Sequence, residues 1–330
     1  MDIIFPLITQ VIILFVMMVP GYLLKKTGLV QEGFGKGISN LVLYIAQPSL
    51  IAYAYISYEG TSDIWWNALW VLILSLLAHG IFAVAALTFF RTAEDYKRRM
   101  LRLATVFSNA AFMGIPLVSV LLGAEATIYA SIYNISFNLF LWTLGVYFCT
   151  ARRDEDGDGT PDGEIKPKHP ISPMKVILHP VMLAAAVGLL VLGLGVSSYI
   201  PPLVISCLEM LKNLVAPLSM VVIGLRMVGM TFRGAFRDKH LYLFLALRHL
   251  ILPLSVLLVL WVLSICGLKL GETVNTVTLL LAATPAATSA TMFAEKYDCD
   301  PVYTSRVVTI STIVSVVTMP LIIMLGSLCL

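Results

Sequence analysis

Two stretches of the chain decide its fold: LATVFSNAAFMGIPLVSVLLG at residues 103–123 and VTLLLAATPAATSATMFAEKY at residues 277–297. The centre of the first carries Ser108, Asn109, Gly114 and Pro116. The centre of the second carries Thr284, Pro285, Thr288, Ser289 and Thr291. Proline removes a backbone donor, and glycine weakens a helix by about 1 kcal/mol. We therefore expect two interrupted helices, with non-helical segments at 108–116 and 284–289.

The two interruptions are related by a constant offset. Sliding the sequence by 177 residues places Ser108 on Pro285, Asn109 on Ala286 and Thr127 on Thr304. One proline in one membrane helix commonly produces only a kink. Matching interruptions in two halves of a chain instead indicate the binding site of a transporter built from inverted repeats.

The composition is that of a membrane protein. Of 330 residues, 59% are hydrophobic and 12% are charged, and the mean hydropathy is +0.91. In a soluble domain, roughly half of the residues are hydrophobic and about a quarter are charged. This composition excludes a soluble enzyme and a nucleic-acid-binding domain, and the five scattered cysteines contain no CxxC pair that would support a zinc site or a disulfide framework. No cofactor is expected.

Ten apolar stretches are long enough, or nearly so, to cross a bilayer, at about 20 residues per crossing. They fall at about 4–24, 34–55, 65–90, 101–122, 126–149, 176–195, 203–225, 240–266, 273–294 and 306–328. None alternates with a period of two, so the spans are helices. The sequence predicts an all-α integral membrane protein with ten transmembrane helices, in which the fourth and ninth are broken and cross.

The distribution of Lys and Arg predicts the orientation, because these residues accumulate in short cytoplasmic loops. The odd-numbered connections hold 19 of them, whereas the even-numbered connections hold only Lys269. Both termini are therefore expected outside. Five helices per half give the halves opposite orientations, as an inverted repeat requires. The predicted organisation is a first repeat at 1–149, a cytoplasmic linker at 150–175 and a second repeat at 176–330.

The linker contains an acidic run that partly matches a calcium-binding loop. Asp154, Asp156, Asp158, Gly159 and Asp162 have the spacing of the first nine positions of an EF-hand loop. The twelfth position is Ile165 instead of a bidentate Glu, and no helical pattern flanks the run. Two interpretations stay open, a solvated acidic linker and a weak divalent-cation site, and we expect residues 154–164 to be a linker without a metal.

Interrupted helices have a direct chemical use. The second half of each begins with unpaired N–H groups and a partial positive charge, which can hold an anion without a full cation. Two such ends meeting within the membrane would bind a carboxylate, and the Asn109 amide can donate to the same group.

Several motifs resemble the auxin efflux carrier family, whose members include plant PIN-type carriers and bacterial permeases for malate or malonate. They are SNAAFMGIPLVSVLLG (108–123), APLSMVVIG (216–224) and TPAATSATMFAEKYDCDP (284–301), followed by PLIIMLG (320–326). The resemblance covers essentially the whole chain. It implies two inverted five-helix repeats, a transport domain that contains the broken helices, a scaffold that often dimerises, and contact between Asn109 and a substrate carboxylate.

Two positions depart from the plant pattern. Ser108 stands where plant carriers have Pro, and Val181 stands where they have Asn early in the sixth helix. The indole acid specificity of the plant carriers is therefore not carried over. The candidate substrate-binding residues are Ser108, Asn109, Gly114, Pro116, Asn134, Asn138, Thr284, Pro285, Ala286, Thr288 and Ser289. For Asn134 and Asn138, lining the pathway and bonding helix to helix are equal alternatives.

Other polar residues in the spans have structural interpretations. Glu209 and Lys212 are expected to pair on one helical face, with ion coupling through Glu209 as the alternative. His79 is expected to be a packing histidine, with proton transfer as its alternative. Arg226 and the Arg248–His249 pair are expected to extend to the cytoplasmic interface, with anion binding as the alternative.

The predicted function is secondary transport of a small organic anion, a carboxylate, across the cytoplasmic membrane of a prokaryote. Expected partners are the substrate, the lipid bilayer, a second copy of the chain, and H⁺ or Na⁺ as a coupling ion. No nucleotide-binding motif is present to use ATP, and no HExxH or GxSxG motif indicates an enzyme. The alternative is a ligand-binding membrane sensor that retains a carrier fold without transport.

Overall fold

The computed structural model describes residues 4–31, 33–59, 63–150, 178–228, 237–297 and 299–330. Within these ranges every element is a helix, and no strand is present. The predicted linker lies outside the described residues except for Thr150, and so does the acidic run at 154–164.

The helices follow the predicted spans with additional breaks. Residues 4–150 form α1 (Ile4–Val16), α2 (Met18–Lys26), α3 (Phe34–Leu41), η1 (Val42–Ala46), α4 (Gln47–Ile56), α5 (Ile64–Phe89), α6 (Asp95–Val106), η2 (Ala110–Gly114), α7 (Ile115–Phe140), η3 (Leu141–Gly145) and α8 (Val146–Thr150). From residue 178 onward the chain forms α10 (Pro180–Leu194), η4 (Ser197–Tyr199), α11 (Pro202–Lys212), α12 (Val215–Met227), α13 (Lys239–Ala246), η6 (Leu247–Ile251), α14 (Leu252–Ile265), α15 (Glu272–Ala283), α16 (Ser289–Lys296) and α17 (Pro301–Cys329).

Six helical segments among the described residues are long and apolar enough to span a membrane. They are Ile8–Lys26, Ile64–Phe89, Ala110–Cys149, Pro202–Met227, Lys239–Ile265 and Pro301–Cys329. Large apolar side chains on their outer faces are exposed, for example Leu203 at 75% and Met210 at 74%. Such a surface is stable in lipid and not in water. The protein is therefore an integral membrane protein, and the count of ten spans remains a prediction.

Three of the π-helical turns are each followed closely by a proline. η1, η2 and η6 each end two residues before Pro48, Pro116 or Pro253, which occupies the first turn of the following α-helix. In a regular α-helix the proline ring would clash with the carbonyl four residues earlier. The wider π-turn contains that carbonyl in each case and lets the helix continue.

The interruptions are shorter than the sequence predicts. The first is confined to residues 107–109, because the chain is π-helical from Ala110 and α-helical from Ile115. The expectation of a non-helical segment through Pro116 was therefore wrong, since the π-turn accommodates that proline. The second interruption covers 284–288, and α16 begins at Ser289. Here Thr284 is extended because it precedes Pro285, which disfavours helical geometry at the residue before it.

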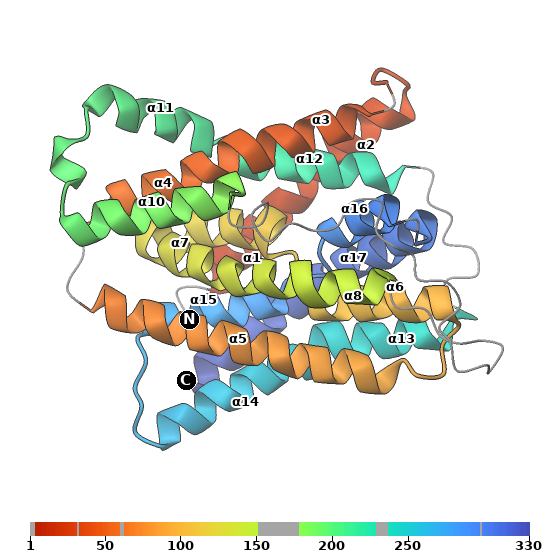
Figure 1. Ribbon diagram of the computed structural model, residues 1–330. Coiled ribbons are helices and arrows are strands. Elements are labelled where there is room, and N and C mark those ends of the chain that lie inside the picture. The colour runs from red at the N-terminus through yellow and green to blue at the C-terminus, as the bar shows by residue number, and fades with distance from the viewer. Residues whose placement is uncertain (1–3, 32, 60–62, 151–177, 229–236, 298) are drawn as a thin grey trace.

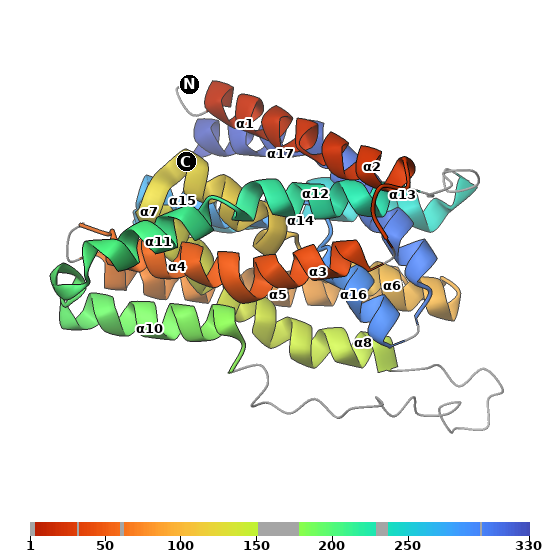
Figure 2. The ribbon, with the colours of Figure 1, turned by 90° about the horizontal axis from the view of Figure 1, so that it is seen from above.

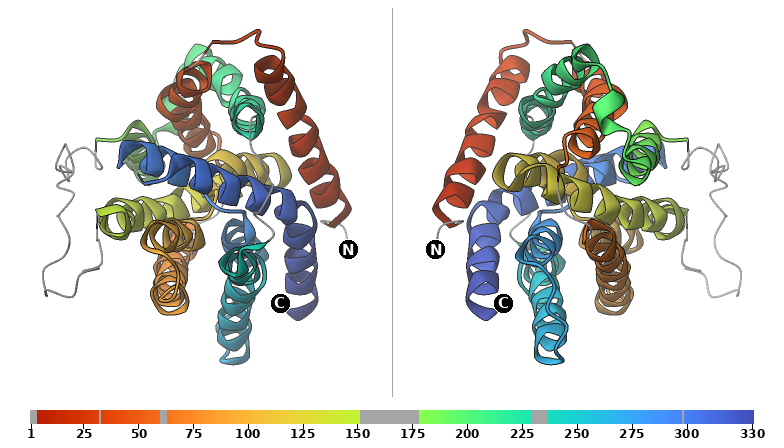
Figure 3. Two further views of the ribbon diagram at one scale, coloured as in Figure 1. Left: turned by 90° about the vertical axis from the view of Figure 1, so that its right-hand side faces the viewer. Right: turned by 90° about the vertical axis from the view of Figure 1, so that its left-hand side faces the viewer.

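The broken helices approach each other from opposite ends of a bundle. In Figure 1, α6 and α16 lie toward one end and α7 and α15 toward the other. Figure 2 shows α1 beside α17, with which it is in contact. The end-on views of Figure 3 show the yellow helix α7 near the middle of the molecule, with other helices around it. A non-helical Gly123 with φ 78° separates the two parts of α7, where the sequence predicts the end of the fourth span.

Helices α2 and α12 approach so closely that their backbones touch. A Cβ atom added at Gly21 would overlap the Val221 carbonyl, and one added at Gly224 would overlap the Met18 carbonyl. Small residues that permit close backbone approach are typical of helix pairs in membranes. This contact joins a helix of the predicted first repeat to one of the second.

We expect Gly21→Ala and Gly224→Ala each to destabilise the purified protein by about 1–3 kcal/mol, because the obstructing atoms are backbone and cannot turn aside. The measurement is thermal unfolding in detergent. Gly80→Ala within α5 is the control, since its Cβ would meet open space. Equal melting temperatures for Gly224→Ala and Gly80→Ala would contradict the role given to this contact.

Candidate functional site

The two interruptions meet and pair through their backbones. Ser108 and Ala286 form an isolated antiparallel bridge. The Asn109 N–H donates to the Pro285 carbonyl at 2.7 Å, and the Ala287 N–H donates to the Phe107 carbonyl at 2.8 Å. We call residues 107–109 and 284–288 the junction. Its backbone bonds replace part of the hydrogen bonding that the broken helices lose.

A cavity of about 270 Å³ opens beside the junction. It is bounded by α3, η1, α4, η2, α7, η3, α16 and the residues around the start of α10. Its lining residues are Asn40, Leu43, Tyr44, Gln47, Ser108, Asn109, Ala111, Phe112, Asn134, Phe137, Asn138, Leu141, Trp142, His179, Val181, Ala287, Ser289, Met292 and Phe293. Among these described residues there is no Asp, Glu, Lys or Arg. The walls are mainly apolar, and amides and hydroxyls supply most of the polar groups.

The structure separates the predicted site residues into two groups. Those that line the cavity are Ser108, Asn109, Asn134, Asn138 and Ser289. Those that do not line it are Gly114, Pro116, Thr284, Pro285, Ala286 and Thr288. Gly114 instead permits close packing on α15, because a Cβ there would overlap the Leu281 side chain. Thr284, Pro285, Ala286 and Thr288 belong to the junction, whereas Gly114 and Pro116 lie in the helix that follows its first segment. The first group faces the space that a ligand could occupy.

The Asn109 side chain is oriented with its amide N–H₂ free. Its Oδ1 accepts the Thr288 N–H at a long 3.5 Å, whereas its Nδ2 is buried and has no hydrogen-bond partner. A buried amide donor without a partner costs free energy unless a ligand or water satisfies it. The Ser289 hydroxyl is also buried without a partner at the start of α16. Both groups can donate to an anion.

The sequence did not indicate Gln47 and His179, which also line the cavity. The Gln47 Nε2 donates to the Ala111 carbonyl at 2.8 Å, and its buried Oε1 has no partner. The sequence feature that could have indicated Gln47 is its position as a polar residue directly before Pro48 in an apolar span. His179 precedes α10, and its Nδ1 accepts the Val181 N–H at 3.4 Å.

The family model described as membrane transport protein matches residues 6–323. The chain belongs to the membrane transport protein family. An uncharacterised transporter of Methanothermobacter thermautotrophicus is 26% identical over 313 residues, covering 94% of this chain and 95% of that protein. An uncharacterised transporter of Methanocaldococcus jannaschii is 23% identical over 294 residues, covering 88% and 89%. The resemblance to auxin efflux carriers is confirmed, since they match the same family.

In this membrane transport protein, Arg248 does not extend to the interface. It is fully buried behind the junction, and its guanidinium donates to the carbonyls of Thr105, Ala282 and Thr284. The expectation of an interfacial arginine was wrong because η6 turns this side chain inward, toward carbonyls that the broken helices leave unpaired.

His249, the next residue, holds the junction through Ser311 of α17. The Ser311 hydroxyl accepts the Ala286 N–H at 2.8 Å and lies 2.9 Å from His249 Nε2. His249 Nδ1 lies 3.0 Å from the Thr318 hydroxyl, which itself donates to the Val314 carbonyl. These bonds are all satisfied when His249 is neutral, with its proton on Nδ1 and Nε2 accepting from Ser311.

Four other polar residues in or beside the predicted spans have neighbours in the structure: Glu209, Lys212, His79 and Arg226. Lys212 lies 3.6 Å from Glu209 and over the ring of Tyr53. The Nδ1 of buried His79 is 2.7 Å from the Ser75 carbonyl. Arg226 donates to the Thr288 carbonyl at 3.5 Å, which brings a cation close to the start of α16.

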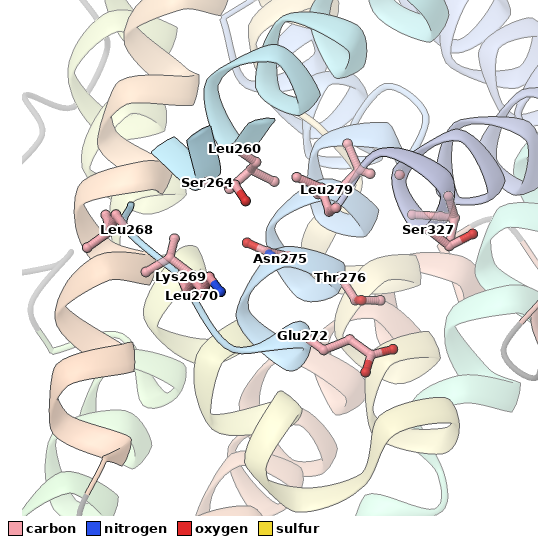
Figure 4. Close-up of a pocket in the computed structure, with 13 residues that line it drawn as sticks. Leu260, Ser264, Leu268, Lys269, Leu270, Glu272, Asn275, Thr276, Leu279 and Ser327 are labelled. Atoms are coloured by element: carbon pink, nitrogen blue, oxygen red, sulfur yellow. The ribbon is translucent and has the colours of Figure 1, made fainter. Parts of the chain in front are cut away.

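A second cavity, of about 600 Å³, lies away from the junction among α14, α15 and α17 (Figure 4). Lys269 and Glu272 lie near the start of α15, and Asn275, Thr276 and Ser327 add neutral polar groups. It contains none of the predicted site residues. Nor do the described residues contain any group of three or more His, Cys, Asp or Glu side chains that could hold a metal ion.

We expect Ser311→Ala to lower the free energy of unfolding by about 1–3 kcal/mol, because it leaves the buried Ala286 N–H without its acceptor. Thermal unfolding in detergent measures the loss. Ser315→Ala is the matched control, since Ser315 is buried on the same helix and its hydroxyl donates to Thr312 of that helix. If both variants lose the same stability, the support of the junction by Ser311 is refuted.

Proposed function

We propose that the protein is a secondary transporter that moves a small carboxylate by alternating access and binds it in the junction cavity. The observation that carries the proposal is the buried, partnerless Nδ2 of Asn109 beside the starts of two helices, in a lining free of acidic residues. The combined helix of η2 and α7 and the helix α16 both begin at the junction. Their N-terminal ends favour a negative charge at this place.

The size and walls of the cavity favour a small ligand. A volume of about 270 Å³ lies just below the usual range of about 300–1,000 Å³ for small-molecule sites. Apolar walls exclude water and strengthen each hydrogen bond to a charged acceptor. Arg226 donates to the Thr288 carbonyl and does not line the cavity, but its positive charge attracts an anion at longer range.

The proposal includes a location and an assembly. We place the protein in the cell membrane of a prokaryote. The 19-to-1 distribution of basic residues supports an orientation with both termini outside. We also propose two inverted five-helix repeats and a homodimer, as the family resemblance implies. The second candidate function remains a sensor that binds the same anion without moving it.

The deciding experiment is uptake into proteoliposomes of radiolabelled acetate, lactate, malonate and malate, supplied separately. A transporter of carboxylates gives saturable flux of at least one of them above that of empty liposomes. A sensor gives saturable binding to the detergent-solubilised protein with no flux. Absence of both binding and flux for all four would reject the proposed substrate class.

We expect Asn109→Ala to weaken binding of the transported acid by roughly 10- to 150-fold, the equivalent of losing one hydrogen bond of about 1.5–3 kcal/mol to a charged acceptor. Asn109→Asp should abolish binding, because it places a carboxylate in the anion site. The melting temperature of Asn109→Ala should change little, since the bond from Thr288 is already long. Thr143→Ala, an exposed position on η3, is the control, and normal uptake by Asn109→Ala would exclude this role.

A further inference from the structure

Two amides that line the junction cavity leave groups of opposite character unpaired. Both side chains are buried, Gln47 at 0% and Asn109 at 2% exposure. The Nδ2 of Asn109 is a donor and the Oε1 of Gln47 is an acceptor, and neither has a hydrogen-bond partner among the described residues. Together the two groups require a molecule that both accepts and donates a hydrogen bond.

Backbone groups fix the orientation of both amides. The Nε2 of Gln47 donates to the Ala111 carbonyl at 2.8 Å, and the Oδ1 of Asn109 accepts the Thr288 N–H at 3.5 Å. Turning the Gln47 amide over would place two acceptors against each other, and turning the Asn109 amide over would place two donors against each other. The unpaired acceptor therefore belongs to Gln47, and the unpaired donor belongs to Asn109.

Both amides lie beside the π-turn η2. Asn109 directly precedes this turn, and Gln47, the first residue of α4, is bonded to Ala111 within it. A small molecule in a cavity of about 270 Å³ can therefore contact both side chains. Asn134 adds a second acceptor to the lining, because its buried Oδ1 also lacks a partner in the described part of the chain.

We propose that Gln47 is a specificity-determining residue whose Oε1 accepts a hydrogen bond from a neutral hydroxyl group on the transported acid. The proposal rests on the proposed function, in which Asn109 binds the carboxylate. A carboxylate has only acceptors, so an acid without a donor leaves the Gln47 oxygen unpaired, and a second carboxylate at this place would be repelled by it. Sites built to bond a substrate hydroxyl discriminate strongly against analogues that lack it.

The charges around the cavity favour a hydroxyl over an ammonium group as the donor. The lining that the structure describes contains no Asp or Glu to pair with a cation. The helix starts at the junction carry partial positive charge, and Arg226 is bonded to the Thr288 carbonyl nearby. An ammonium group buried without an acidic partner is costly. A short hydroxy acid therefore fits this site better than an amino acid of the same size.

The test compares acids that differ only by a hydroxyl group: acetate with glycolate, propionate with lactate, and succinate with malate. Isothermal titration calorimetry on the purified full chain in detergent gives each dissociation constant. We expect the hydroxy acid to bind about 10- to 100-fold more tightly than its partner, because only the hydroxy acid satisfies Gln47. Alanine, in which an ammonium group replaces the hydroxyl of lactate, should bind more weakly than lactate.

Gln47→Leu should abolish this preference, because leucine has a similar size and no acceptor. The variant should bind the hydroxy acid about 10- to 100-fold more weakly than the wild type and the partner acid about equally well. A purely structural role would instead weaken both acids alike. Ser49→Ala is the matched control and should keep the preference, since Ser49 is buried on the same helix outside the lining and its hydroxyl donates to the Ile45 carbonyl.

Equal affinities within every pair that binds would overturn the role of Gln47 and leave carboxylate binding intact. Tighter binding of alanine than of lactate would also overturn it, and so would an unchanged preference in Gln47→Leu. If Gln47→Leu fails to fold, the comparison of acids on the wild-type protein still decides. A hydroxyl preference without flux into proteoliposomes would support the role of Gln47 and reject transport, whereas absence of binding by every acid would reject both proposals.

Discussion

The structure depends on one constraint: polar backbone groups inside a membrane need partners within the protein. Breaking two helices in the interior frees N–H and C=O groups that water cannot satisfy there. The junction meets this need by pairing its own backbones and by recruiting Arg248 for carbonyls and Ser311 for the Ala286 N–H. The remaining donors, above all the Asn109 amide, face the cavity. In the proposed function, a bound carboxylate supplies the acceptors that these donors lack.

A single irregular turn supplies both supports. Arg248 and His249 are consecutive in η6, and both contribute to the junction, one through its carbonyls and the other through Ser311. In a regular α-helix, the side chains of consecutive residues point about a quarter-turn or more apart around the helix axis. The π-turn exists because Pro253 follows it and would clash with a regular preceding turn. A proline outside the site therefore shapes the backbone from which two of its supporting residues extend.

The sequence predicted much of this organisation because its signals are local. Pro285 disfavours helical geometry at Thr284, so α15 ends at Ala283, and Asn109 lies at the first break. The two broken helices and five of the residues that line the cavity could therefore be expected from the sequence. The inward position of Arg248 could not, because hydropathy alone does not distinguish an arginine that extends to the interface from one that caps buried carbonyls. The π-turn before Pro116 could not be predicted either, because a proline in the sequence does not distinguish a break in the helix from a wider turn that accommodates it.

The neutral lining of the cavity is consistent with a carrier that must release what it binds. A full cation in direct contact with an anion in an apolar cavity gives strong attraction that is hard to reverse. Helix ends and an amide give partial charges, which orient a carboxylate with less retention. Arg248 lies behind the junction, outside the cavity lining. Four hydrogen bonds to carbonyls fix its guanidinium there and partly compensate its positive charge. In the proposed function, this separation of the cation from the cavity lining allows the site to favour anions and still release them.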